Sequence, residues 1–102
     1  MQFIPVDQDR FSNVVALGQT RPDADQQGTQ KERDGVPVWK ITVLVNTSPD
    51  EKPSVEDIKV PHPTEPSLTP MTSIEFDNLT AVAWQMNGRA GVSLRADGFQ
   101  EA

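Results

Sequence analysis

The sequence predicts an all-β domain. Apolar and polar residues alternate over several short stretches, which is the period of a strand with one covered face. The 102 residues include 9 prolines and 6 glycines, so the chain is broken too often for long helices. A chain of this length supports one modest core. We therefore expect a single domain over residues 1–102.

The N-terminal segment holds an arm and then a strand. Residues 1–10 have no hydrophobic period and are expected to form a loosely held arm. The first strand is expected within Arg10–Arg21, because the run Asn13–Leu17 favours β structure. Gly18 interrupts this run and indicates a bulge or a bend.

A polar segment, residues 22–35, separates the first strand from the second. It lacks apolar residues for a core and ends in Asp34-Gly35, a pair typical of tight hairpin turns. We expect a long exposed loop. Nothing around its Asp23 and Asp25 resembles the spaced ligands of a calcium-binding loop, so these two carboxylates are interpreted as solvated charges.

The second strand, Val36–Asn46, carries the strongest strand signal. Alternation places Trp39 on one side with Ile41, Val43 and Val45, and we expect this apolar side to face the core. The opposite side then points outward and mixes apolar and cationic groups, as a binding surface or a partly covered sheet face does. Its members are Val38, Lys40, Thr42 and Leu44.

A third strand and a connection follow. The strand is expected over Val55–Pro61, with Ile58 and Val60 on one side and Lys59 on the other. Residues 61–70 contain four prolines. We predict an extended crossover there, since neither a helix nor a central strand tolerates so many prolines.

The C-terminal part predicts a hairpin. Thr72–Met86 alternates but changes register at Asp77-Asn78, as a bulge or a corner does. Asn87-Gly88 is the strongest hairpin signal of the chain, and it leads into the alternating stretch Arg89–Phe99. The total is five strands.

Five short strands favour a small closed barrel over a flat sheet, because closure removes exposed strand edges. A sandwich needs about seven strands. We therefore predict a five-stranded barrel similar to the oligonucleotide-binding (OB) fold. It has a long loop between strands 1 and 2 and a β-hairpin at the C terminus.

Composition argues against most catalytic sites. The chain has no cysteine, and His62 is its only histidine, so thiolate sites, three-histidine metal sites and Cys/His or Ser/His pairs lack their members. We interpret His62 as a surface residue, and we expect neither an enzyme nor a cofactor. No stretch resembles a membrane span or a signal peptide. The expected location is the cytoplasm.

The positions of the charged residues are more informative about binding than the net charge is. A net charge of −6 argues against a protein that coats DNA indiscriminately. Many acids lie in predicted loops, whereas Lys40, Lys59 and Arg95 lie inside strand patterns and Arg89 lies at a turn. An acidic protein with this pattern can carry a locally basic face.

Trp84 is the second tryptophan, near the tip of the predicted hairpin. It shares its parity with Met86, while Ala81 and Ala83 have the other parity. If the small residues face the barrel interior, Trp84 and Met86 project outward. Core packing, a dimer contact and stacking on bases all remain open for Trp84.

Four segments together resemble a family of small proteins encoded on actinobacterial plasmids, phages and integrative elements. Those proteins are similar to the OB-fold single-stranded DNA-binding proteins of filamentous phages. The segments are VVALGQTR, RDGVPVWKITVLV, IEFDNLTAVAW and GRAGVSLRADGF. Their most specific parts are D-G-x-P-x-W at Asp34–Trp39 and G-x-S-x-R-A at Gly91–Ala96.

The resemblance implies an OB barrel, often dimeric, that binds single-stranded DNA. It implies that Lys40, Lys59, Arg89 and Arg95 contact phosphates, that Trp84 stacks on bases, and that Arg21, Lys31 and Arg33 on the long loop close over the strand. Thr42 would accompany Lys40 on the outward side of the second strand.

The sequence is compatible with two functions. The first is a homodimeric, non-enzymatic single-stranded DNA-binding module that serves replication or transfer of a mobile element. The alternative is an OB-like protein-interaction module without nucleic-acid affinity. The net charge of −6 and the apolar pair Trp84 and Met86 favour this alternative.

Overall fold

A computed structural model describes residues 2–5, 13–46 and 52–101. This part of the chain is all β, as predicted, and contains no helix that could span a membrane. Its nine strands are β1 Gln2–Pro5, β2 Asn13–Pro22, β3 Glu32–Arg33, β4 Val36–Asn46, β5 Ser54–Pro61, β6 Thr72–Asp77, β7 Thr80–Met86, β8 Arg89–Arg95 and β9 Gly98–Glu101.

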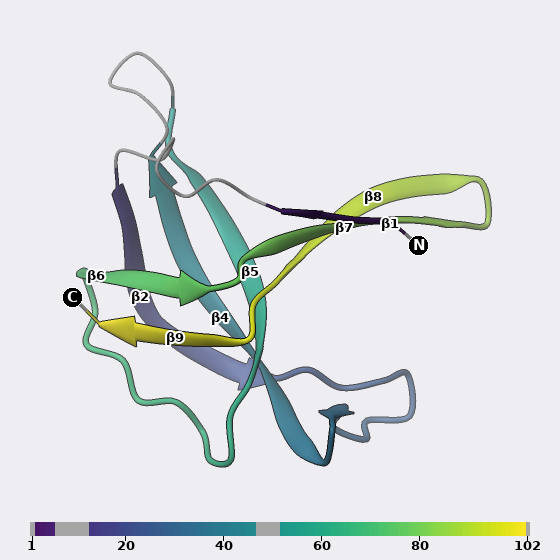
Figure 1. Cartoon of the computed structure of the whole chain (residues 1–102), viewed down its shortest axis with the longest axis horizontal. Helices are drawn as coiled ribbons and strands as arrows, with labels where there is room; N and C mark the ends of the chain where they lie inside the picture. Colours follow the sequence, from purple (N-terminus) through teal and green to yellow (C-terminus); the bar gives the residue numbers. More distant parts are fainter. Residues whose placement is uncertain (1, 6–12, 47–51, 102) are drawn as a thin grey trace.

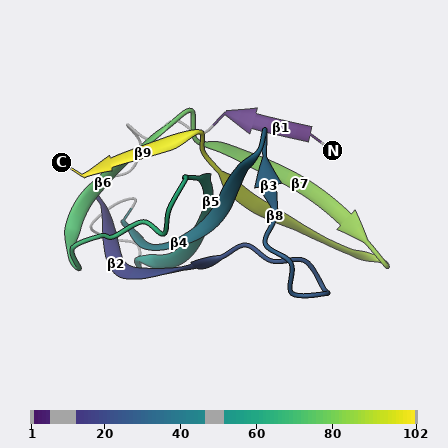
Figure 2. The ribbon, with the colours of Figure 1, turned by 90° about the horizontal axis from the view of Figure 1, so that it is seen from below.

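Eight of these strands form one curled sheet in the order β1-β7-β8-β5-β4-β2-β6-β9, and β3 pairs with β4 beside it. The β5–β8 pair is parallel and the other pairs are antiparallel. The long strands β2, β4 and β5 stand side by side, and β6 and β9 cross in front of them (Figure 1). In Figure 2, β9 lies across the interior from β2, while the β7–β8 hairpin extends away. The sheet is a half-barrel.

The core fills the inner side of this curl. Ile41 and Val43 of β4 and Ile58 and Val60 of β5 are at most 1% exposed. β6 closes over them with two buried apolar side chains, and the crossover after β5 adds Leu68. The alternation of apolar residues in the central strands is therefore explained by a core on one side only.

The strand count exceeds the expected five because the chain turns corners inside two predicted strands. Asn78 has a φ of 52° and divides Thr72–Met86 into β6 and β7. Arg89–Phe99 likewise divides into β8 and β9, and the N–H of Asp97 donates to the carbonyl of Asp77 at 2.8 Å. The two corners are thus tied together. β6 and β9 pair with each other beyond them.

Two short strands lie where no strand was predicted. Within the expected loose arm, Gln2–Pro5 pairs with β7, while residues 6–10 lie outside the described ranges. β3 lies inside the expected loop of residues 22–35 and forms a small hairpin with β4. Its turn is the predicted Asp34-Gly35, with φ values of 54° and 82°.

Gly18 produces the bend that was predicted for the first strand. Its φ is 81°, and the β2–β4 register shifts between Ala16 and Thr20. A Cβ atom at Gly18 would lie 2.7 Å from Cγ of Pro70. The crossover therefore passes directly against β2 at a point where only glycine leaves enough space.

The two sides of β4 compare differently with the prediction. Trp39 is half-buried rather than in the core, and its Nε1 donates to the carbonyl of His62 at 2.9 Å. On the other side, Val38 and Thr42 are buried while Lys40 and Leu44 are half-buried, so of the two predicted alternatives this side is the partly covered sheet face. Residues 22–35 fold back against this side, as the 3.0 Å bond from Gln30 Nε2 to the Val38 carbonyl indicates.

His62 was expected to be a surface residue, but it is half-buried. Its ring centroid lies 5.5 Å from that of Phe99, and its Nδ1 lies 2.8 Å from the carbonyl of Thr64. His62 is less exposed than expected because the proline-rich crossover packs against β4 and β9.

Candidate nucleic-acid interface

Four basic residues lie in register across four neighbouring strands. Arg21 of β2 is the partner of Lys40 of β4, Lys40 is the partner of Lys59 of β5, and Lys59 is the partner of Arg95 of β8. Neighbouring strands are about 4.8 Å apart, so the four positions span roughly 14 Å. Arg21, Lys40, Lys59 and Arg95 are called the basic row below.

The basic row lies on the outer side of the sheet. Lys59 stands between the core residues Ile58 and Val60, and Arg95 follows Leu94, which packs against the core. Successive side chains of a strand point to opposite sides. The row is therefore directed away from the core.

Like charges placed directly opposite each other destabilise a sheet. The basic row contains three such neighbouring pairs in succession. A surface that served solubility alone would alternate the two signs of charge along this line. A row of like charges of this kind is favourable only where anionic groups lie close to it.

Two carboxylates on the same side offset part of this charge. Asp23 lies between two lysines, with Oδ1 3.8 Å from Lys40 Nζ and Oδ2 3.9 Å from Lys59 Nζ. Asp57 Oδ2 lies 2.5 Å from Nη2 of Arg21, and its Oδ1 accepts a 2.7 Å hydrogen bond from the hydroxyl of Thr42. Thr42 therefore orients a carboxylate here rather than presenting a free hydroxyl.

The burial of Asp23 corrects the prediction of a solvated charge. Asp23 is 4% exposed. Its N–H donates to the carbonyl of Val38 at 3.0 Å, and its carbonyl accepts from the N–H of Lys31 at 2.7 Å. The chain after β2 thus continues against the outer side of the sheet. Asp25 is exposed, as predicted.

Sequence reasoning missed Asp23 as a member of the site. The one available signal is its parity, because Asp23 lies two positions after Arg21 and therefore on the same side if the strand continues. Residues 22–35 are polar, however, and polar segments favour a loop that leaves the sheet.

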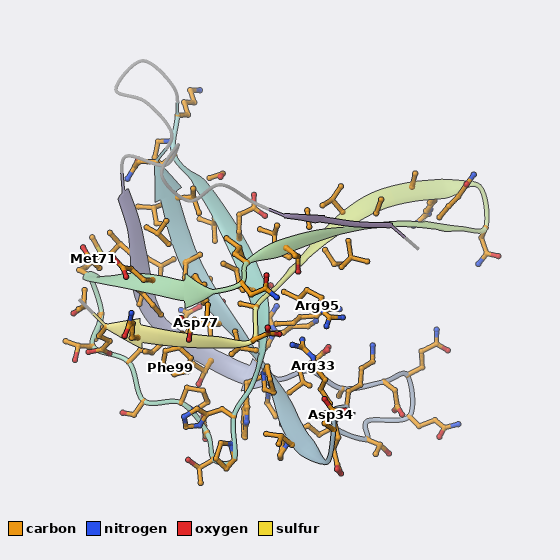
Figure 3. All side chains as sticks on the ribbon, viewed as in Figure 1. Arg33, Asp34, Met71, Asp77, Arg95 and Phe99 are labelled. Atoms are coloured by element: carbon orange, nitrogen blue, oxygen red, sulfur yellow. The ribbon has the colours of Figure 1, made fainter. Side chains whose placement is uncertain are left out.

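Arg33 extends the positive charge beyond the β8 end of the row. Its Nη1 donates to the carbonyl of Ala96 at 2.9 Å and lies 3.4 Å from Oδ1 of Asp97. Burial lowers the pKa of the Arg33 guanidinium, and Arg95 lowers it further, while Asp97 and Asp34 act in the opposite direction. Figure 3 shows Arg33 and Arg95 next to each other, from β3 and β8. The Arg33 side chain nevertheless remains protonated at neutral pH, because an arginine guanidinium is not deprotonated in proteins.

The remaining predicted residues lie apart from the row. Lys31 is exposed on the segment before β3. Arg89 is exposed at the hairpin and is the register partner of Met86, six positions or roughly 20 Å along β8 from Arg95. Trp84 is the register partner of Gly91, and its side chain lies outside what the structure describes.

Other kinds of site find less support. Among the described residues, no group of three or more His, Cys, Asp or Glu side chains is placed to hold a metal ion. A cavity of about 280 Å³ on the inner side has a mainly apolar lining that includes Val14, Ile58 and Val92.

Comparisons with protein-family models, with curated proteins and with solved structures found no match for this chain. What the protein binds is therefore inferred from its own residues. Of its described surfaces, the basic row is the one whose residue types and spacing indicate a class of ligand.

Proposed function

We propose that this protein is a non-enzymatic module that binds single-stranded DNA, with the phosphates lying along the basic row. The observation that carries the proposal is the register of four cations on four adjacent strands. A strand of nucleic acid that crosses the sheet meets one cation per β-strand. Neutralised phosphates release counterions, which is the main source of affinity for such ligands.

Trp84 is proposed to stack on bases beside this row. Thr80 is the register partner of Arg95, and position 84 has the same parity as position 80. Four residues of a strand cover roughly 13 Å, so position 84 lies about that far from the row along β7. Stacking on an aromatic ring contributes about 1–3 kcal/mol per base without sequence preference.

The finer fold assignment belongs to the same proposal. An OB-like barrel is supported by the curl of β2, β4 and β5, by β6 and β9 across the interior, and by the projecting hairpin of β7 and β8. The resemblance carried by Asp34–Trp39 and Gly91–Ala96 supports a role in replication or transfer of a mobile element.

A homodimer is proposed as the acting form. β5 pairs with β8 only at Leu94 and Arg95, so within the described ranges the outer edge of Arg89–Ser93 has no partner strand. Val92 on this edge is 66% exposed. Exposed edges of this kind pair readily with a second copy. Sedimentation velocity should show a dimer that Val92→Lys weakens, and a monomer at all concentrations would contradict it.

The direct test is fluorescence anisotropy with a labelled oligo-dT strand. At about 50 mM salt a phosphate-binding protein should bind at low micromolar concentration. Lys59→Gln should weaken binding roughly tenfold, because it removes a central cation of the row. Lys52→Gln is the matched control, since Lys52 is exposed, lies outside the row and carries the same charge. It should change the affinity less than twofold.

Two results would contradict the proposal. The first is the absence of binding by the unaltered protein at about 50 mM salt. The second is an equal loss of affinity in Lys59→Gln and Lys52→Gln, since that would indicate attraction to net charge rather than to the row.

A protein-interaction module is the second candidate. Its supporting observations are the exposed apolar side chains Val55, Met71 and Val92 on a chain of net charge −6. A purified protein partner that remains bound after nuclease treatment and that Val92→Lys releases would favour this function over DNA binding.

A further inference from the structure

Lys40 and Lys59 are both paired with a carboxylate of the protein itself, that of Asp23. The two carboxylate oxygens of Asp23 are divided between the two ammonium groups, at 3.8 Å and 3.9 Å. The lysine side chains are 29% and 31% exposed, whereas the Asp23 side chain is 5% exposed. The carboxylate is therefore much less accessible to solvent than the two lysine side chains that it contacts.

Asp23 is held there by its backbone. Its N–H donates to Val38 and its carbonyl accepts from Lys31, at 3.0 Å and 2.7 Å. Gln30 adds a side-chain bond to the Val38 carbonyl, and an isolated bridge joins Ala24 to Gln30. The backbone of residue 23 is thus fixed against β4, which keeps the base of its side chain beside the two lysines.

This arrangement differs from the pairs at the ends of the row. Arg21 and its partner Asp57 are both more than a third exposed, so water screens that pair. The Asp23 side chain is only 5% exposed, so its charge acts on Lys40 and Lys59 with less screening than in the Arg21–Asp57 pair. Asp23 consequently offsets one of the two central charges that a phosphate would otherwise meet.

We infer that Asp23 is a built-in competitor of phosphate at Lys40 and Lys59 and that it sets how tightly the basic row holds its ligand. The inference rests on the proposed function for the nature of the ligand. With Asp23 in place the two lysines present a net charge of one to the solvent side. The affinity for phosphate at the centre of the row is therefore lower, and the ligand dissociates more easily.

The first experiment measures thermal stability with inorganic phosphate as the probe. Asp23→Asn leaves two adjacent lysines without their carboxylate, so phosphate should bind between them. At about 50 mM phosphate, compared with chloride of equal ionic strength, the melting temperature should rise by roughly 5 °C more in Asp23→Asn than in the unaltered protein.

Glu32→Gln is the matched control. Glu32 lies on the same segment, is exposed and loses the same charge. Phosphate stabilises proteins generally by exclusion from their surfaces, and this variant measures that effect. Equal shifts in Asp23→Asn, Glu32→Gln and the unaltered protein would overturn the inference.

The second experiment measures affinity for labelled oligo-dT in a double-mutant cycle. Asp23→Asn should bind roughly tenfold more tightly than the unaltered protein, and Glu32→Gln less than twofold more tightly. Lys59→Gln should bind roughly tenfold more weakly, since Asp23 then neutralises Lys40. Adding Asp23→Asn to Lys59→Gln should restore the affinity to within about threefold of the unaltered protein.

If Asp23→Asn alone does not fold, the double variant still tests the inference. It contains only one of the two lysines, so it lacks the repulsion between two lysines that have no carboxylate between them. A purely structural role for Asp23 predicts no rescue, and absence of rescue would overturn the inference. If no variant binds oligo-dT, the proposed function fails. The phosphate-dependent stabilisation of Asp23→Asn then still decides whether Asp23 occupies an anion site.

Discussion

Thr42 shows how a single buried hydroxyl orients a charged group beside the basic row. It is buried, and it donates a 2.7 Å hydrogen bond to Oδ1 of Asp57, whose other oxygen contacts Arg21. A buried hydroxyl without a partner is costly. This bond therefore satisfies Thr42 and fixes the carboxylate that neutralises one end of the basic row.

We expect Thr42→Val to lower the free energy of unfolding by about 1.5 kcal/mol, because it removes one hydrogen bond to a charged, partly exposed group. The change is measured by urea denaturation. Thr64→Val is the control, since Thr64 is exposed and its hydroxyl is not used in the contacts described above. A Thr42→Val protein as stable as the control variant would show that the hydrogen bond contributes nothing.

The burial of Val38 and Asp23 could not be predicted from the alternation of side chains alone. Alternation assigns Val38 to the outer side of β4 correctly, yet Val38 is buried, because the segment after β2 returns over that side. The same return buries Asp23. Parity specifies a side of a strand, but it does not say whether another segment covers that side.

The bend of β2 depends on a single residue, Gly18. Gly18 combines a φ of 81° with close approach to Pro70. Both properties follow from the absence of a Cβ atom. The bend lets β2 pair with β4 before and after it, and with β6 at Val15 and Ala16.

Gly18→Ala should therefore destabilise the protein by about 2–3 kcal/mol, from backbone strain and from the contact with the rigid Pro70 ring. Gly28→Ala is the matched control, because Gly28 has a φ of 84° and no atom within 4 Å of the added Cβ. It should cost only about 1 kcal/mol of strain. Equal losses in urea denaturation would show that the Pro70 contact is unimportant.

The turns were the most predictable elements. Asn87-Gly88 was expected from its residue types, and both residues have positive φ, 52° and 77°. Asp34-Gly35 behaves in the same way. By contrast, the chain corner at Asn78 was recognised only as a change of register, since a bulge and a corner leave the same mark on an alternating pattern.

The molecule as a unit carries a net charge of −6 and yet places four cations in one line. A net negative charge repels nucleic acid at long range, so the proposed binding would depend on short-range contact with the basic row. Salt should act on the affinity through these few contacts.

We expect the logarithm of the oligo-dT association constant to fall with the logarithm of salt concentration with a slope of about −2, since Asp23 offsets one of the four cations and each of the three remaining charges neutralises a phosphate that contributes roughly −0.7. The slope is measured by anisotropy titrations between about 50 and 200 mM salt. Asp23→Asn should make it steeper. Binding with a slope near zero would contradict a phosphate interface.

Local patterns in the sequence were sufficient for the all-β class, the apolar sides of β4 and β5, the bend at Gly18 and the hairpin turns. These features depend on residues that are neighbours in the chain, and alternation and turn chemistry record such relations directly. The basic row and the burial of Asp23 depend instead on which residues of distant strands are paired. Several registers are compatible with the same alternation, because a shift by two residues keeps every side chain on its side. Packing of the core chooses among them, and that choice aligned Arg21, Lys40, Lys59 and Arg95 and brought Asp23 between two of them.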